Sequence, residues 1–167
     1  MWRLTPKRAA SAASVGDDKL GGYLATRHLI DLGHRRIGIV AGPDYATSSR
    51  GRLAGYLHAL EEGQIAVAPE LIVPSTFSID SGEAAARHLM ELTRPPTAIF
   101  AINDNTAIGS MSAIAQAGLS VPGDISLVGY NDIPIVSRLP VPLTTVRMPF
   151  DRVAEVALQL LFDDGGG

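Results

Sequence analysis

Short, continuous apolar runs alternate with longer amphipathic stretches between residues 15 and 129, and this alternation restricts the fold more than any other feature of the chain. The apolar runs occupy 37–41, 71–73, 97–102 and 125–128. Uninterrupted apolar runs of this length are typical of strands that are buried on both faces. Strands that alternate with helices of about 10–15 residues indicate a parallel sheet with right-handed crossovers. We therefore predict an α/β protein of three layers, with helices on both faces of a parallel sheet.

Capping residues and glycines predict the limits of the intervening helices. The predicted starts are Asp17-Asp18, the end of a polar loop over 44–51, the capping-box pair Asp80 and Glu83, and Asn103-Asp104. The predicted ends are Gly33, Leu60, Leu92 and Gly118, and the fourth helix is expected to bury Ala107, Met111, Ile114 and Ala115. Gly129 is expected to close the last of these strands.

The pattern changes after residue 129. Prolines punctuate the chain there, and the remaining candidates are one short strand over 143–146 and one amphipathic helix over 150–162. We expect residues 163–167, which end in three glycines, to form a flexible tail. Residues 1–14 combine basic and small residues without a periodic apolar pattern, so we expect a disordered or non-native leader.

Composition excludes several classes of function. The 167 residues suit a single domain, and a net charge of −3 argues against a chain that binds nucleic acid through charge alone. The absence of cysteine excludes disulfides, iron–sulfur clusters and thiol nucleophiles, and it is compatible with a reducing cytoplasm. No apolar run approaches the ~18 residues of a membrane helix. We therefore expect a cytoplasmic protein without membrane contact.

Motifs of catalysis and metal binding are missing from the sequence. It contains no G-x-S-x-G, H-E-x-x-H or G-x-x-x-x-G-K-[ST] motif. The histidines are scattered over predicted helices and helix ends, which disfavours a metal site. We expect no enzyme activity, no metal and no cofactor.

Polar residues gather where the predicted strands end. Ligands of open parallel sheets bind beyond the carboxyl ends of the strands, and this rule selects the loops 44–52, 75–78, 103–105 and 130–132. The loops hold an arginine, amides, carboxylates, hydroxyls and aromatic rings, an inventory that suits a small polyhydroxylated ligand. Asn103 and Asp104 are equally suited to capping a helix, so both uses stay open at this point. A single arginine such as Arg52 is more often an ordinary surface residue, and its placement among these loops favours a function.

Sequence motifs along the chain resemble a known family. They are VGDDKLGGYLATRHLIDLGHRRIGIVAGP at 15–43, RLAGYLHAL at 52–60, NDNTAIGSMSAIAQAGLSVPGDISLVGYNDI at 103–133 and PLTTVRMP at 142–149. Their order and spacing resemble the effector-binding domain of LacI/GalR-type transcriptional regulators, from residue 15 to about residue 161. The resemblance implies a periplasmic-binding-protein-like fold of type I, with two lobes and the effector in the cleft between them.

The same resemblance implies a division of the chain. Residues 15–142 would form the C-terminal lobe, and 143–162 would be a crossover strand and helix that belong to the N-terminal lobe. That lobe and the helix-turn-helix headpiece of the family have no counterpart in the sequence, so we expect a truncated family member. Operator DNA would then be bound only through the missing headpiece, and the family leads us to expect a homodimer.

Site residues follow from matching this sequence to the family position by position. The resemblance implies effector contacts from Ser48, Arg52, Phe77, Asn103, Asn131 and Phe150. Phe150 rests on the resemblance alone, whereas the others lie in the loops selected above, as does Asp104. Asn131 departs from the family, which has an acidic residue there, and this leaves the choice between a sugar and a nucleoside open.

The function that we expect is the sensing of a small polar effector, a sugar or a related molecule, for a LacI-type repressor. The alternative is a solute-binding module of a sugar transporter. That role would require a secretory signal and a second lobe, and the sequence shows neither. An α/β enzyme is less favoured still because the catalytic motifs are missing.

Overall fold

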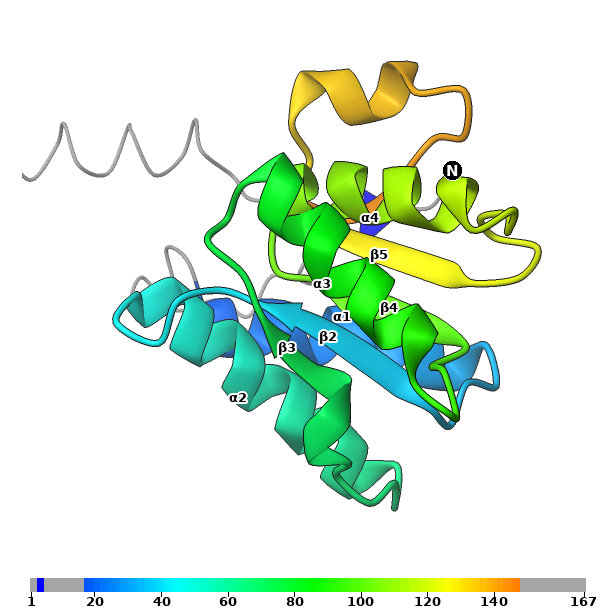
Figure 1. The fold of residues 1–167 in the computed structure, drawn as a ribbon. Helices are drawn as coiled ribbons and strands as arrows, with labels where there is room; N and C mark the ends of the chain where they lie inside the picture. Colours follow the sequence, from blue (N-terminus) through cyan, green and yellow to red (C-terminus); the bar gives the residue numbers. More distant parts are fainter. Residues whose placement is uncertain (1–2, 5–16, 148–167) are drawn as a thin grey trace, which may run out of the picture.

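Parallel strands form the central layer of the structure, a computed structural model that describes residues 3–4 and 17–147 (Figure 1). The strands are β1 (Arg3–Leu4), β2 (Ile37–Ala41), β3 (Ile72–Pro74), β4 (Ala98–Ala101), β5 (Ser126–Asn131) and β6 (Thr144–Arg147). Their order in the sheet is β1-β6-β5-β4-β2-β3, and every neighbouring pair is parallel. The predicted parallel α/β sheet is confirmed.

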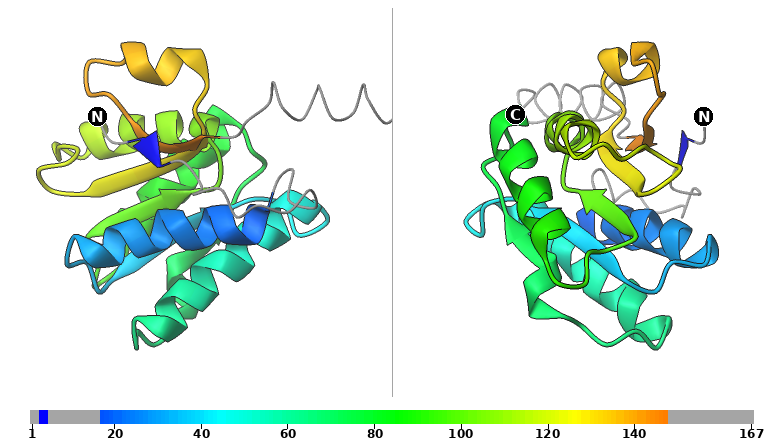
Figure 2. Two further views of the ribbon diagram at one scale, coloured as in Figure 1. Left: turned by 180° about the vertical axis from the view of Figure 1, so that it is seen from behind. Right: turned by 45° about the vertical axis from the view of Figure 1, so that its right-hand side comes forward.

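Helices cover both faces of the sheet, as Figure 2 shows from behind and from the side. They are α1 (Asp18–Asp31) and α2 (Thr47–Glu62) on one face, and α3 (Ile79–Glu91) and α4 (Asp104–Gln116) on the other; the short 3-10 helices η1 (Pro69–Leu71) and η2 (Pro134–Arg138) lie in connections. Helices α1 and α2 pack against each other, and so do α3 and α4. This is the predicted three-layer arrangement.

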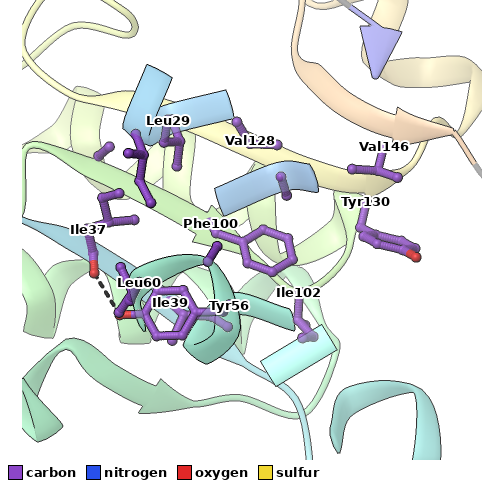
Figure 3. Packing of buried hydrophobic residues seen from close by; sticks show 14 of the residues in the cluster. Leu29, Ile37, Ile39, Tyr56, Leu60, Phe100, Ile102, Val128, Tyr130 and Val146 are labelled. Atoms are coloured by element: carbon purple, nitrogen blue, oxygen red, sulfur yellow. Dashed lines mark hydrogen bonds between the residues drawn. The ribbon is translucent and has the colours of Figure 1, made fainter. Parts of the chain in front are cut away.

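The central strands divide their side chains between two apolar clusters, because successive residues of a strand point to opposite faces. All five residues of β2 are buried. Ile39 joins the cluster beneath α1 and α2 (Figure 3), whereas Val40 joins the cluster beneath α3 and α4. Phe100 and Ile99 on β4 divide in the same way. Burial on both faces explains the uninterrupted apolar runs of the sequence.

The predicted caps of α1 and α4 are confirmed. Asp17 accepts a hydrogen bond from the Leu20 amide at 2.9 Å, and Gly33 follows α1 with a φ of +97°, which glycine adopts without strain. Asn103 accepts a hydrogen bond from the Thr106 amide at 2.8 Å and opens α4 in a capping box. Gly118, with a φ of +74°, follows α4.

Four local predictions are wrong. Ser78, and not Asp80, caps α3, because its hydroxyl accepts a hydrogen bond from the Ser81 amide at 3.1 Å. Helix α2 starts at Thr47 inside the predicted polar loop, and its N-cap Ala46 offers no side-chain signal. Gly129 lies within β5 instead of ending it, and Ala115 on α4 is exposed.

Several predicted segments fall outside the described residues. These are the final helix, the tail over 163–167 and all of the predicted leader except residues 3–4, which pair with β6 as strand β1. The division of the chain into lobe, crossover and leader therefore stays a prediction. Among the described residues, no helix is both long and apolar enough to cross a bilayer.

Candidate functional site

Arg52 is the charged centre of the carboxyl edge of the sheet. The side chain extends from the second turn of α2, and only 7% of the residue is exposed. Its Nε donates a hydrogen bond to Asp18 Oδ1 at 2.9 Å, and its Nη1 donates to the Ile102 carbonyl oxygen, just past β4, at 2.8 Å. Helix α1 and the end of β4 therefore fix the guanidinium group at this edge.

Tyr130, near the end of β5, supports the arginine from the side of the sheet. The guanidinium carbon of Arg52 lies 3.7 Å from the centre of the Tyr130 ring, a cation–π arrangement. Burial raises the pKa of Tyr130 to about 12, although the positive charge of Arg52 acts in the opposite direction. The phenol therefore stays neutral at physiological pH and serves as an aromatic platform for Arg52.

Two adjacent glycines in α1 allow this packing. A Cβ atom on Gly22 would overlap the backbone of Arg52, and a Cβ atom on Gly21 would overlap the Tyr130 side chain. Helix α1 therefore approaches α2 and β5 more closely than would be possible if residues 21 and 22 carried side chains. The Gly21-Gly22 step is a structural requirement of the arginine site.

Phe77 and Asn103 form a second part of the same edge. Asn103 Nδ2 donates a hydrogen bond to the Phe77 carbonyl oxygen at 3.1 Å, which ties the start of α4 to the loop before α3. Phe77 has a φ of +67°, in the left-handed region. A Cβ atom on Gly42 would overlap the Phe77 ring, so the ring lies over the end of β2. Because Asn103 also caps α4, both ends of its amide have protein partners.

Asp104 is buried among hydrogen-bond donors, with 1% of the residue exposed. Its Oδ1 accepts a hydrogen bond from the Thr145 hydroxyl at 2.7 Å, and its Oδ2 accepts one from the Ile133 amide at 2.8 Å. Burial raises the pKa of Asp104, while these hydrogen bonds lower it by a smaller amount. The carboxylate thus joins α4 to β6 and to the chain after β5.

Asn131 ends β5 in an unusual backbone conformation. Its φ is +112°, and the following Asp132 has a φ of +59°. Two left-handed residues in succession turn the chain sharply away from the sheet. Asp132 Oδ2 accepts a hydrogen bond from Arg147 Nε on β6 at 2.8 Å, which fixes the turn. Asn131 itself is half-buried at the strand end.

The structure brings most of the predicted site residues to the carboxyl edge. Ser48 lies one turn before Arg52 on α2 and is half-buried. Phe77 lies in the connection after β3, Asn103 lies between β4 and α4, and Asn131 is the last residue of β5. Phe150 lies outside the described residues.

Sequence reasoning missed the partners that hold Arg52 and Asp104. Asp18 was assigned to helix capping, and it lies 34 positions before the arginine that it binds. Thr145 lies 41 positions after Asp104. The glycine pair in α1 was the one available signal, since adjacent glycines within a helix suggest a close approach.

The chemistry of this edge is recognition by hydrogen bonds and ring contacts. Arginine, amide and aromatic groups can hold hydroxyl groups and cover the apolar face of a small ring. In the described part of the chain, no three of the histidine, aspartate and glutamate side chains form a group that could hold a metal ion.

The sequence of this chain is similar to those of known proteins. The sequence model of the periplasmic binding protein-like domain matches residues 26–164. The chain is 42% identical to the ribose operon repressor of Haemophilus influenzae, over 85% of this chain and 43% of that protein. It is also 42% identical to the HTH-type transcriptional repressor PurR of Proteus mirabilis, over 86% of this chain and 42% of that protein.

A solved structure shows the same architecture. A LacI-family regulatory protein from Chloroflexus aggregans superposes with a TM-score of 0.85 at 36% identity, covering 87% of this chain and 53% of that one. The chain spans less than half the length of the two curated relatives described above.

Proposed function

This chain belongs to the periplasmic binding protein-like domains of LacI-type regulators, and from that premise we propose that it senses a small polar effector for a transcriptional repressor. The effector would be a sugar or a related polyhydroxylated molecule. Arg52, Ser48, Phe77 and Asn131 would contact it from the carboxyl edge of the sheet.

One observation carries the proposal: three separate elements hold Arg52 buried at the carboxyl edge of the sheet. An arginine that served solubility would extend into water, whereas this one is stacked on Tyr130 and bonded to Asp18. Holding a guanidinium group rigid reduces the entropy that is lost when a ligand binds. The arrangement therefore suits a preorganised donor for ligand oxygens.

Hydrogen bonds also support a positioning role for two of the expected contacts. Asn103 holds Phe77 and caps α4, and Asp104 binds the chain after β5. We propose these two residues as supports that orient Phe77 and Asn131, with the effector bound by the residues that they orient.

Regulation of transcription would require the parts of the relatives that this chain does not match. Operator DNA would be bound by a helix-turn-helix headpiece, the element that the name of the PurR relative includes. Effector binding would shift the equilibrium between arrangements of the two lobes and thereby bias the headpieces of a homodimer. A transporter solute-binding module is the alternative. It is less favoured because both relatives described above are repressors.

Calorimetry with D-ribose, a set of hexoses and adenosine tests the effector site directly. We expect saturable binding of at least one of these probes, and we expect Arg52→Gln to weaken it by about 1.5–3 kcal/mol, the value of hydrogen bonds to a charged group. Urea unfolding of the same variant separates a loss of binding from a loss of fold.

Arg27→Gln is the matched control. Arg27 Nε bonds Asp31 Oδ1 at 3.0 Å, nearly the geometry of the Arg52 pair, but its side chain is 40% exposed on α1. Its loss should leave the affinity unchanged. Equal affinities in the Arg52 variant and the wild type would remove Arg52 from the site, and an absence of binding by every probe would contradict the proposed effector class.

A further inference from the structure

Asp18 holds Arg52 through only one of its two carboxylate oxygens. Its Oδ1 accepts the hydrogen bond from Arg52 Nε at 2.9 Å. Within residues 3–4 and 17–147, its Oδ2 accepts no hydrogen bond, and 21% of the Asp18 side chain is exposed. A ligand group at the carboxyl edge of the sheet can therefore reach an acceptor that the fold does not use.

The position of Asp18 is fixed by the two helices that it joins. It is the first residue of α1, and a Cβ atom on Gly51 would overlap its side chain, so Asp18 packs directly against α2. The neighbouring Asp17 has a different task, because its carboxylate accepts a hydrogen bond from the Leu20 amide and caps α1. Helix capping therefore does not account for the Asp18 carboxylate.

Arg52 offers donors next to this acceptor without an excess of positive charge. Its bonds to Asp18 and to the Ile102 carbonyl oxygen occupy only part of the N–H donors that a guanidinium group has. Asp18 already balances its positive charge at 2.9 Å. Asp104, two positions after Ile102, adds a buried carboxylate to the same edge. The pair thus presents a donor and an acceptor side by side.

From this pairing we propose that Asp18 selects the charge of the effector, so that the site accepts an uncharged hydroxyl group and rejects an anionic group. The inference rests on the proposed function, because it concerns the same site. A hydroxyl group can donate to Asp18 Oδ2 and accept from Arg52 at the same time. A carboxylate or a phosphate dianion only accepts hydrogen bonds, so it would lose hydration and place its negative charge beside Asp18. The effector class is therefore a neutral polyol, and sugar acids and sugar phosphates are excluded.

Pairs of probes that differ in charge test this selection. Calorimetry at constant ionic strength compares D-glucose with D-glucuronate, D-galactose with D-galacturonate, and D-ribose with D-ribose 5-phosphate. We expect the neutral member of at least one pair to bind, and its anionic counterpart to bind about tenfold more weakly or less. Equal or tighter binding of the anionic member would overturn the inference and leave the effector site in place. If no probe of either charge bound, the proposed effector class would be contradicted, and this inference with it.

Two matched variants identify the residue that selects. Asp18→Asn keeps an oxygen for Arg52 Nε and replaces the second acceptor by a donor, so the tenfold difference should fall to about twofold. Asp17→Asn removes the same charge one position earlier and retains a good N-cap, so the difference should persist. Urea unfolding verifies that both variants fold. Equal effects of the two substitutions would assign the selection to the net charge of the edge, and the inference would be wrong.

Inorganic phosphate provides a test that does not depend on the identity of the effector. In the ¹⁵N-labelled chain, the NMR signal of the Arg52 Nε–H group reports on its bond to residue 18. Phosphate should cause no saturable shift of this signal in the wild type and a saturable shift in Asp18→Asn. A saturable shift in the wild type would show that anions bind Arg52 in spite of Asp18. The absence of a shift in Asp18→Asn would show that another group excludes anions, and either result would overturn the inference.

Discussion

At the scale of single residues, burial determines how much two ion pairs of similar geometry contribute. The Arg52–Asp18 and Arg27–Asp31 pairs have almost the same length, but the arginine side chains are 9% and 40% exposed. An exposed ion pair contributes little to stability, whereas a buried charge that loses its partner is costly. The resemblance to a family identified Arg52, but the sequence alone does not reveal Asp18, because a contact across 34 residues leaves no local pattern.

Asp104 should contribute more to stability than its position in an exposed-looking N-D-N motif suggests. Asp104→Asn replaces one acceptor by a donor that faces the Thr145 hydroxyl or the Ile133 amide. We expect a loss of about 1–3 kcal/mol in the free energy of unfolding at neutral pH. Urea titration measures it, with Asp31→Asn, at the exposed end of α1, as the control.

The pH dependence of that loss has a definite sign. The folded pKa of Asp104 is raised above 3.8 by burial, so the folded state binds this proton more readily than the unfolded state. The wild type therefore gains stability from this group as the pH falls through the folded pKa, and the asparagine variant does not. The difference in the free energy of unfolding between wild type and variant should increase in acid. A difference that decreases would contradict the buried environment of Asp104.

At the scale of elements, close backbone approaches determine which helices pair. Periodicity predicted α1 and α2 as separate helices, but it does not encode the contact between Gly22 and the Arg52 backbone. The start of α3 was misplaced for a related reason, since Ser78 and Asp80 are both acceptable caps and only the chain direction after β3 selects Ser78.

Gly22→Ala should push α1 away from α2. The added methyl group overlaps backbone atoms, which cannot rotate aside, so we expect a loss of about 1–3 kcal/mol in the free energy of unfolding. Thermal unfolding measures the loss. Gly123→Ala is the control because its new methyl group meets the Ser120 side chain. Equal melting temperatures for the two variants would show that α1 can move away from α2 at little cost in free energy.

His34 links the start of β5 to the residue that precedes β4. Its Nδ1 lies 2.9 Å from Thr97 Oγ1, and its Nε2 lies 2.9 Å from Ser126 Oγ. Burial lowers the pKa of His34 below 6.5, so the neutral ring stabilises the fold. This contribution is complete above pH 6.5 and is lost as the pH falls through the lower folded pKa.

The corresponding test compares unfolding curves between about pH 7 and pH 5. His34→Gln keeps a donor and an acceptor but cannot be protonated, so its stability should fall less steeply in acid than that of the wild type. His28, whose pKa is also lowered by burial, remains in both proteins and accounts for part of the slope that is left. His88→Gln, on the exposed side of α3, is the control variant. Identical slopes for the His34 variant and the wild type would refute the assignment.

At the scale of the whole molecule, the sequence was most informative about architecture. The alternation of apolar runs and amphipathic segments predicted a parallel sheet between two helical layers, because such strands must be covered on both faces. The carboxyl-edge rule then located the segments that contain Arg52, Phe77 and Asn131. It could not distinguish ligand contacts from supports such as Asp104, because that difference depends on which way a side chain faces.

Exposed isoleucines on one helical layer lead to a prediction about assembly. Ile79 at the start of α3 and Ile135 in η2 are 44% and 53% exposed. Both lie beside α4: the Ile79 carbonyl packs at Gly109, and η2 follows Ile133, whose amide bonds Asp104 at the start of α4. Two exposed isoleucines on this layer are candidates for residues of a protein interface. We expect the chain to form a symmetric dimer through this layer.

Sedimentation equilibrium distinguishes this interface from a general tendency to associate. Ile135→Asp places a charge on the proposed face and should shift the chain to monomers, while its free energy of unfolding at low concentration stays close to that of the wild type. Leu32→Asp is the control: Leu32 is 61% exposed, but it follows α1 on the opposite layer. Because Leu32 is the more exposed of the two, non-specific association would be weakened at least as much by its substitution. A dimer that survives Ile135→Asp and dissociates with Leu32→Asp would place the interface on α1 and α2 instead.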